Sequence, residues 1–408
     1  MRMERPASKD WLEPATYWSR MASATADLDT PFGVISVPAL ASNALDMLDR
    51  AAGKPIRVAT KSVRVRGVIE AVLQLPGYSG VLAYTLAEGL WLAESVTDVV
   101  VGYPTVDRAS IRALGSSAEL ASRVTIMVDS VEQLDVVDAV LAPAQRETIR
   151  VCLEMDASWH SRLLGRLGVL RSPVRTPDQA RALAEKIVSR PGFTLVGVMG
   201  YEAQIAGVTN RLPGRPLMRR TVRYVQSNST LELAERRGAV VAAVREVADL
   251  EFVNGGGTGS IETTSADASV TEIAAGSGLF GPHLFDGYRH FSPAPAAAFA
   301  LSVVRKPSAD TATLLGGGWV ASGPPAVDRL PQIAWPTGLR MAPREMAGEV
   351  QTPVRGPAAR NLGVGDRVWL RHTKAGELSA HVNEFALVDG DRVIGSFPTY
   401  RGERKVFL

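Results

Sequence analysis

The chain has almost no cysteine: Cys152 is the only one among 408 residues. A single thiol excludes an intrachain disulfide framework and a cysteine-rich zinc site. Cys152 lies in the apolar run 150–155, which predicts a buried strand. In such a strand a free thiol packs as a small apolar side chain. We therefore expect no catalytic role for it.

Long uninterrupted apolar runs are also missing. No stretch approaches the ~18 apolar residues that a membrane-spanning helix needs. The first eleven residues carry several charges and lack the apolar core of a secretory signal. These absences predict a chain that does not enter a membrane and has a cytoplasmic location.

Neither positive nor negative charge is in clear excess. The chain has 45 basic and 42 acidic residues, for a formal net charge of +3, and no block of lysine and arginine stands out. This pattern gives no electrostatic footprint for nucleic acid or an anionic membrane. Apolar residues make up 46% of the chain, which is the balance of a globular protein. We therefore expect a small-molecule partner.

From about Thr30 to Tyr288, short β-branched runs alternate with alanine-rich amphipathic stretches. This alternation predicts parallel βαβ units, and about eight units favour a (β/α)₈ barrel. A doubly wound open sheet is the alternative, but no glycine fingerprint opens the first unit. The predicted strands are 32–37, 56–60, 99–103, 124–129, 151–155, 194–199 and 251–253. The predicted helices are 42–52, 65–75, 85–95, 130–141, 177–189 and 230–247.

The sequence pattern changes after about His290, where proline and glycine residues separate short strand-like runs. The turn 389–391, Asp-Gly-Asp, separates two of these runs and is a strong hairpin signal. The fold class is thus α/β, a (β/α)₈ TIM barrel with a C-terminal, mostly antiparallel β domain. We divide the chain into an N-terminal arm (1–28) packing on the β domain, a barrel (29–290) and the β domain (291–408).

Two small-residue turns follow the last predicted barrel strands. The first is 254–260, Asn-Gly-Gly-Gly-Thr-Gly-Ser, and the second is 275–278, Ala-Gly-Ser-Gly. Glycines let main-chain amides approach an anion closely, and barrels commonly hold phosphate at this position. The turns lack the lysine of a nucleotide-binding P-loop. We expect them to bind the phosphate of a cofactor.

Lys61 directly follows the short predicted strand 56–60. The carboxyl ends of barrel strands are where such folds place their catalytic residues. Burial disfavours the ammonium form of a lysine, and a neutral amine forms a Schiff base with an aldehyde. A surface lysine after a strand is the plainer interpretation. In combination with a phosphate-binding turn, Lys61 indicates pyridoxal phosphate (PLP).

The run 57–61, Arg-Val-Ala-Thr-Lys, resembles the lysine motif of the D-threonine aldolase and D-serine dehydratase family, fold-type III PLP enzymes with an alanine racemase-like barrel. Runs 165–169 and 197–201 resemble the arginine and aromatic segments of that family, and the two turns resemble its phosphate-binding turns. The resemblance implies that Lys61 carries the Schiff base and that Arg166 and Tyr201 contact the cofactor ring. It also implies a phosphate site made by Gly256, Gly257, Thr258, Gly276 and Ser277.

One departure from the family concerns its divalent metal, which is bound by a histidine and by a cysteine or aspartate two residues later. Here His372 stands at the first position, but Lys374 stands at the second, and an ammonium group is no metal ligand. His381, with Glu377 or Glu384, lies close enough in sequence to substitute. The sequence leaves metal binding open. Without a metal, we expect His372, Lys374 or His381 to act as an acid or base on the substrate hydroxyl, and His372 is favoured by its place in the family pattern.

By this resemblance the chain is a PLP-dependent lyase acting on a β-hydroxy amino acid, either by aldol cleavage or by dehydration with deamination. A racemase or epimerase on the same fold is one alternative, with Tyr400 as its second base. A non-catalytic PLP-binding protein is another, and a barrel with no cofactor, in which Lys61 is incidental, is a third. We expect a homodimer, since sites of this type often form between the barrel of one subunit and the β domain of another.

Overall fold

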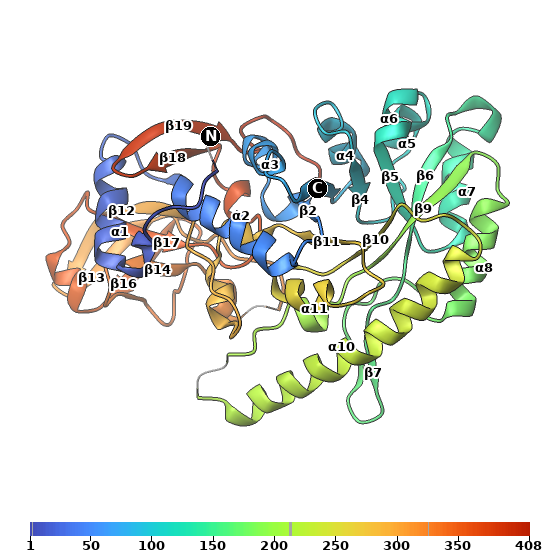
Figure 1. Ribbon diagram of the computed structural model, residues 1–408. Helices are drawn as coiled ribbons and strands as arrows, with labels where there is room; N and C mark the ends of the chain where they lie inside the picture. The colour runs from blue at the N-terminus through green and yellow to red at the C-terminus, as the bar shows by residue number, and fades with distance from the viewer. Residues whose placement is uncertain (2, 212–213, 325) are drawn as a thin grey trace. The chain divides into compact units, whose positions relative to one another are not determined.

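The computed structural model describes residues 1, 3–211, 214–324 and 326–408 (Figure 1). The chain divides into two compact units. The first comprises residues 1–46, 61–75 and 277–406, and the second comprises residues 47–60, 76–276 and 407–408. The chain therefore passes from the second unit to the first between Thr60 and Lys61, and again between Gly276 and Ser277.

The second unit contains a closed barrel of eight parallel strands, and its strand order is β10-β11-β2-β3-β4-β5-β6-β9. Strands buried on both faces read as continuous apolar runs, and every residue of β4 and β5 is buried. The strands are β2 (Ile56–Ala59), β3 (Tyr78–Ala83), β4 (Val99–Val101), β5 (Val124–Val128), β6 (Ile149–Glu154), β9 (Phe193–Gly200), β10 (Phe252–Gly255) and β11 (Glu272–Ala275).

Helices alternate with these strands along the chain. They are α2 (Val37–Ala51), α3 (Arg66–Leu73), α4 (Leu86–Leu92), α5 (Arg108–Gly115), α6 (Ala118–Arg123), α7 (Val131–Val140), α8 (Pro177–Val188), α9 (Ala203–Ala206), α10 (Pro216–Arg245) and α11 (Ile261–Ser265). A short hairpin, β7 (Trp159–Ser161) and β8 (Gly165–Leu167), precedes α8. Across the described residues, no helix is long and apolar enough to cross a membrane.

A charged group is buried among the barrel strands. Arg57 on β2 is 2% exposed, and its Nε donates to Glu272 Oε1 at 2.7 Å. Its Nη1 and Nη2 donate to Asp98 at 2.9 Å, and Asn254 donates to Glu272 at 2.8 Å. Each buried charge therefore has a partner, as burial in a low-dielectric core requires. Cys152 is fully buried, as expected.

The first unit contains a nine-stranded, mostly antiparallel sheet. Its main path runs β15-β16-β13-β12-β1-β18-β19, and β17 pairs with β12 and β14. The strands are β1 (Phe32–Ser36), β12 (Ala297–Ser308), β13 (Thr311–Leu315), β14 (Gln332–Trp335), β15 (Arg340–Met341), β16 (Gln351–Arg355), β17 (Arg367–Arg371), β18 (Glu384–Asp389) and β19 (Arg392–Pro398). The predicted combination of a (β/α)₈ barrel with a mostly antiparallel β domain is confirmed.

One predicted barrel strand lies elsewhere. β1 pairs antiparallel with β12 and parallel with β18, so it belongs to the sheet of the first unit. Its buried apolar residues look the same in either sheet, because local pattern does not identify the partner strand. The barrel instead contains β3, whose sequence Tyr-Ser-Gly-Val-Leu-Ala has one β-branched residue and gave no strand signal.

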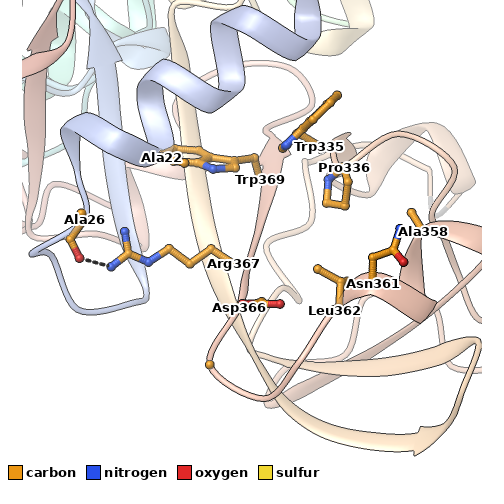
Figure 2. A pocket seen from close by; sticks show the side chains of 11 residues that line it. Ala22, Ala26, Trp335, Pro336, Ala358, Asn361, Leu362, Asp366, Arg367 and Trp369 are labelled. Carbon is orange, nitrogen blue, oxygen red and sulfur yellow. Dashed lines mark hydrogen bonds between the residues drawn. The ribbon is translucent and has the colours of Figure 1, made fainter.

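Helix α1 (Pro14–Ala24) packs on this sheet through an aromatic cluster. Trp18 lies 5.7 Å from Trp369 between ring centroids, and Tyr17 and Met21 are buried beside them. A pocket of about 520 Å³ opens at the edge of this cluster, and its lining includes Trp335, Trp369 and Leu362 (Figure 2). The pocket contains none of the site residues predicted from sequence.

Candidate functional site

Polar residues end four neighbouring strands at the carboxyl end of the barrel, where barrel enzymes carry their active sites. Tyr103 follows β4, Asp129 follows β5, Glu154 is the last residue of β6 and Tyr201 follows β9. Glu154 is 2% exposed. Carboxylates and phenols are thus held together at the predicted functional end.

Arg171 joins this group of side chains. Its guanidinium carbon lies 5.0 Å from the ring centroids of both Tyr103 and Tyr201. It also contacts Glu154 Oε1 at 3.4 Å. Such cation–π contacts fix the orientation of both rings as well as the guanidinium. No sequence signal distinguishes Arg171 from a surface arginine, and the sequence analysis missed it.

Arg166, the arginine predicted to contact the cofactor, lies on the exposed hairpin strand β8. Its Nη2 pairs with Asp156 at 3.2 Å, and its Nε donates to Ser158 at 3.1 Å. Asp156 is buried and also accepts from Arg175 at 3.3 Å. Arg166 is thereby held within an ion network of the hairpin, whereas Arg171 contacts the predicted ring-binding residue Tyr201.

Burial is the main cause of the pKa shifts of Glu154 and Tyr201 at this end of the barrel. It raises the pKa of Glu154 to about 7, although Arg171 acts in the opposite direction and Asp129 adds to the rise. It also raises the pKa of Tyr201 to about 12, so this phenol stays protonated at neutral pH. Glu154 therefore changes its charge in the physiological range, which is the condition for acid–base work.

We expect Glu154→Gln to change the pH dependence of stability. An acid whose pKa is raised on folding stabilises the fold below its unfolded pKa, and that contribution is lost as pH rises through about 7. The wild-type protein should therefore lose up to about 3 kcal/mol relative to Glu154→Gln between pH 5 and pH 8. Urea unfolding at both pH values measures this difference. A difference that does not vary with pH would contradict the shift.

The glycine-rich turn begins in the last residues of β10. Gly256 has a φ of +87°, which glycine adopts without strain. A Cβ on Gly257 would lie 3.0 Å from Ala206 Cβ and 3.4 Å from Tyr201 Cε2. Thr258 then begins a short helical turn. This close approach leaves little room for a larger residue beside Tyr201.

Glu202 holds the turn in place. This buried carboxylate accepts from the Gly256 amide at 3.1 Å, from Thr264 Oγ1 at 2.6 Å and from Arg237 Nη2 at 3.1 Å. Arg237 is 2% exposed and also pairs with Asp267 at 3.1 Å. In this structure the Gly256 amide donates to Glu202 and the Gly257 amide donates to Ser260 Oγ at 3.2 Å, so both amides have partners within the chain. Sequence reasoning missed Glu202, since a glutamate after a strand resembles a surface residue.

The second turn, residues 275–278, follows β11, which pairs with β2. β11 pairs in parallel with β2, with Ala275 opposite Val58. A Cβ on Gly276 would lie 2.3 Å from the carbonyl oxygen of Ala59, so no larger residue fits there without a backbone shift. Lys61 follows Ala59 by two residues, and Ser277 follows Gly276 directly. The lysine and the second turn thus leave the barrel from adjacent strands.

Within the first unit, the segment that begins at Lys61 contacts the loop after β17. A Cβ on Gly376 would lie 2.3 Å from the Lys61 carbonyl oxygen, and Ser379 Oγ donates to the Val63 carbonyl at 2.7 Å. Lys61 is exposed, so the burial expected for a lysine at the end of a barrel strand is not observed. The predicted Schiff-base lysine and the loop that carries His372 are therefore held against each other through their backbones.

His372 is the first residue of this loop, and 1% of it is exposed. Neither ring nitrogen has a hydrogen-bond partner among the described residues, and the Phe280 ring lies 6.3 Å away. Burial lowers the pKa of His372 to about 4, opposed mainly by the charge of Glu377. A buried polar atom without a partner commonly marks the place of a ligand or water. His372 is thus a neutral imidazole whose ring nitrogens make no close hydrogen bond, although the nearby Ala297 backbone favours its protonated form.

Glu377 shapes the same loop. Its carboxylate accepts from the amides of Thr373 at 2.8 Å, Lys374 at 2.6 Å and Ala375 at 2.8 Å. These bonds and the nearby His372 hold the pKa of Glu377 below its usual value despite burial. His381 follows the short helical turn Leu378–Ala380 and stacks on Trp319 with an interplanar angle of 2°.

These donors do not fit the metal of the resembling family. In the described part of the chain, no three histidine, cysteine, aspartate or glutamate residues are grouped as metal ligands. Glu377 is committed to backbone amides, and Glu384 accepts from Ser396 at 2.7 Å. The residues do fit the expected cofactor, because the two turns suit a phosphate and Tyr201 and Arg171 present a flat aromatic and cationic surface.

Comparisons with known proteins agree with this fold. Residues 35–283, more than half of the chain, match the model of the alanine racemase N-terminal domain. The D-threonine aldolase of Arthrobacter sp. is 26% identical over 269 residues, 64% of either chain. The 3-hydroxy-D-aspartate aldolase of Paracoccus denitrificans is 25% identical over 262 residues, 62% of this chain and 61% of that protein. These alignments span less than two thirds of the curated relatives.

Solved structures extend the likeness of fold to nearly the whole chain. D-threonine aldolase from Filomicrobium marinum matches with a TM-score of 0.76 at 20% identity, over 92% of this chain and 96% of that one. D-threo-3-hydroxyaspartate dehydratase from Delftia sp. HT23 matches with a TM-score of 0.68 at 20% identity, over 92% and 98%. The predicted membership is confirmed: the chain belongs to the alanine racemase N-terminal domain family.

Proposed function

We propose that this protein is a PLP-dependent lyase that acts on a β-hydroxy-D-amino acid. The observation that carries the proposal is the arrangement of β11 and β2, from whose carboxyl ends Gly276 and Lys61 follow. The relatives support the substrate class, because the named aldolases and the dehydratase all act on D-amino acids with a hydroxyl group on the β-carbon.

In this proposal Lys61 Nζ binds the aldehyde of the cofactor. Thr258 and Ser277 bind its phosphate through their amides and hydroxyls, together with the amide of Gly276. Gly256 and Gly257, whose amides donate to Glu202 and Ser260, shape the first turn around it. Tyr201 and Arg171 orient the ring, and Glu202 acts indirectly by holding the first turn. When bound, PLP supplies an electron sink for the pair of electrons released when a bond to the substrate α-carbon breaks.

His372 is the proposed base for the substrate hydroxyl. At neutral pH its imidazole is uncharged, since burial lowers its pKa to about 4. A neutral ring nitrogen without a hydrogen-bond partner is able to accept a proton from a hydroxyl group. Glu377 positions the loop and favours the protonated imidazole electrostatically. No step of this proposal uses a metal.

A matched pair of variants tests which arginine contacts the cofactor. We expect Arg171→Gln to weaken cofactor binding about 10- to 100-fold, the scale of a lost charged contact. Arg166→Gln removes a partly exposed ion pair and should leave cofactor binding within about threefold. Titration of each apoprotein with PLP, followed by absorbance, gives both affinities. The reverse order would return the ring contact to Arg166.

The base is tested by His372→Asn. We expect turnover to fall by about 10²- to 10⁴-fold, the range for loss of a general base, with cofactor loading unchanged. His381→Asn serves as the matched control, because His381 stacks on Trp319 and should leave turnover nearly unchanged. Wild-type turnover of His372→Asn at full cofactor occupancy would contradict the assignment.

Product analysis tests the proposed function as a whole. The loaded protein is incubated with the D- and L-forms of threonine, serine and 3-hydroxyaspartate. An aldehyde or 2-oxo acid together with a shortened amino acid identifies aldol cleavage, whereas a 2-oxo acid with ammonia identifies dehydration. We expect one of these products from D-substrates only. Recovery of the inverted amino acid alone would indicate a racemase instead, and no reaction with any of them would contradict the lyase.

A further inference from the structure

Two segments of the barrel unit, residues 157–177 and 203–231, contain nine arginines but no aspartate, glutamate or lysine. Without these nine, 36 of the 45 basic residues remain against 42 acidic ones. The positive net charge of the chain therefore comes from these two segments, although neither is a continuous basic run. Their arginines, which we call the arginine rim, are Arg162, Arg166, Arg171, Arg175, Arg211, Arg215, Arg219, Arg220 and Arg223.

Both segments follow barrel strands at their carboxyl ends. The first joins β6 to α8 and includes the hairpin of β7 and β8. The second follows β9 and includes α9 and the first half of α10. In a (β/α)₈ barrel, the connections from a strand to the next helix surround the active site. The topology thus places the arginine rim around the functional end of the barrel.

Contacts beyond the end of β9 hold α10 beside Tyr201. A Cβ on Gly207 would lie 3.5 Å from Tyr201 Oη. Val208 follows directly, and its carbonyl accepts from Gln226 Nε2 of α10 at 2.9 Å. Gln226 therefore lies near the level of the phenol that is proposed to contact the cofactor ring.

The hairpin meets α10 at nearly the same level. Trp159 on β7 and Tyr224 on α10 lie 6.1 Å apart between ring centroids (Figure 1). Arg223 and Arg219 precede Gln226 by about 5 Å and about 10 Å along the helix axis. They are four residues apart, so they lie on one side of the helix. Arginines of both segments are thus gathered close to Tyr201.

Most of these arginines are not neutralised within the chain. Arg166 and Arg175 pair with Asp156, and Arg171 contacts Glu154. The remaining six side chains make no ion pair with any residue that the structure describes: Arg162, Arg211, Arg215, Arg219, Arg220 and Arg223. Their charges remain available to attract an anion from solution.

Free charge of one sign around a cleft raises the local concentration of ligands of the opposite sign. At neutral pH, a β-hydroxy amino acid with an uncharged side chain is a zwitterion without net charge. A second carboxylate gives the molecule a net negative charge, so the arginine rim attracts it. We propose, on the basis of the lyase function above, that the arginine rim selects β-hydroxy-D-amino acids that carry a second carboxylate over those with uncharged side chains.

The salt dependence of two substrates tests this selection on one fully PLP-loaded protein. 3-Hydroxy-D-aspartate is the anion, and D-threonine is its counterpart without net charge. The Debye length falls from about 30 Å at 0.01 M salt to about 8 Å at 0.15 M. Over this range we expect kcat/KM to fall about fivefold or more for 3-hydroxy-D-aspartate and to change less than about 1.5-fold for D-threonine. Equal salt dependence of the two substrates would overturn the proposal.

The double variant Arg219→Gln/Arg223→Gln tests whether the arginine rim causes the effect. At 0.01 M salt we expect about threefold or greater loss of kcat/KM for 3-hydroxy-D-aspartate, and little loss at 0.15 M. Its kcat/KM for D-threonine should stay unchanged, which also shows that the variant is folded and loaded. Equal losses for both substrates would contradict a role of charge in selection.

Arg245→Gln is the matched control. Arg245 is an exposed arginine at the other end of α10, about 39 Å from Arg219 along the axis and well beyond a Debye length. We expect this change to leave both substrates unaffected. A loss as large as that of Arg219→Gln/Arg223→Gln would show that net charge, and not the arginine rim, causes the effect.

The substrates that react separate this proposal from the lyase function itself. Turnover of D-threonine or D-serine without turnover of 3-hydroxy-D-aspartate would overturn the selection and leave the lyase in place. Turnover of 3-hydroxy-D-aspartate alone supports the selection if the double variant loses activity at 0.01 M salt, and overturns it if the variant does not. No turnover of any of the three would contradict the proposed function.

Discussion

Lys61→Ala is expected to abolish both colour and catalysis. The loaded wild-type protein should absorb near about 420 nm, the band of PLP held by a lysine, and the variant should lack this band. Turnover should fall by about four orders of magnitude or more, the scale seen when a covalent catalytic residue is removed. The measurement is an absorbance spectrum and a rate for each protein after incubation with PLP.

Lys54→Ala provides the control, since Lys54 lies before β2 and its Nζ donates to the Asp267 carbonyl at 2.5 Å. We expect its spectrum and rate to match the wild type apart from a small loss of stability. If Lys61→Ala retained the band, another lysine would hold the cofactor, and the proposed role of β2 would be wrong.

Glu202→Ala has the second large expected effect, and it acts on stability and cofactor binding together. The change removes an acceptor from the Gly256 amide, Thr264 and Arg237 at once. Arg237 keeps only Asp267 as a partner, and loss of one member of a buried ion pair costs about 3–5 kcal/mol. Urea unfolding measures the loss, and PLP titration should show weaker binding as the turn relaxes.

The exposed pair between Arg181 and Glu246 serves as the comparison. These side chains are 47% and 60% exposed, so Glu246→Ala should cost less than about 1 kcal/mol and leave PLP affinity unchanged. Equal losses of stability in the two variants would show that Glu202 contributes no more than a surface charge. Unchanged PLP affinity in Glu202→Ala would separate Glu202 from the phosphate turn.

The barrel could be predicted from sequence because most of its strands are buried on both faces and therefore read as apolar runs. Residues 124–128 are an example, since all five are buried. β1 has the same pattern, yet it pairs with β12 and β18, because partner choice depends on tertiary contacts. β3 gave no signal, since its core positions are interrupted by serine and glycine.

For the site, sequence alone suggests candidates where a residue type is itself diagnostic. Consecutive glycines and a lysine at the end of a strand belong to that class, and the close contact of Gly276 with Ala59 explains the demand for glycine, while the cofactor roles of these residues stay predictions. Arg171 and Glu202 could not be predicted, because their roles depend on which buried group lies next to them. An arginine or a glutamate in a loop carries no such information in its local sequence.

The central claim is that Lys61 holds PLP, and reduction with borohydride tests it most directly. Reduction makes the link between lysine and cofactor permanent, so that peptide mass mapping can locate it among the seven lysines of the chain. The account predicts the added mass on the peptide that contains Lys61 and on no other. Label on a different lysine, or none after full incubation with PLP, would contradict it.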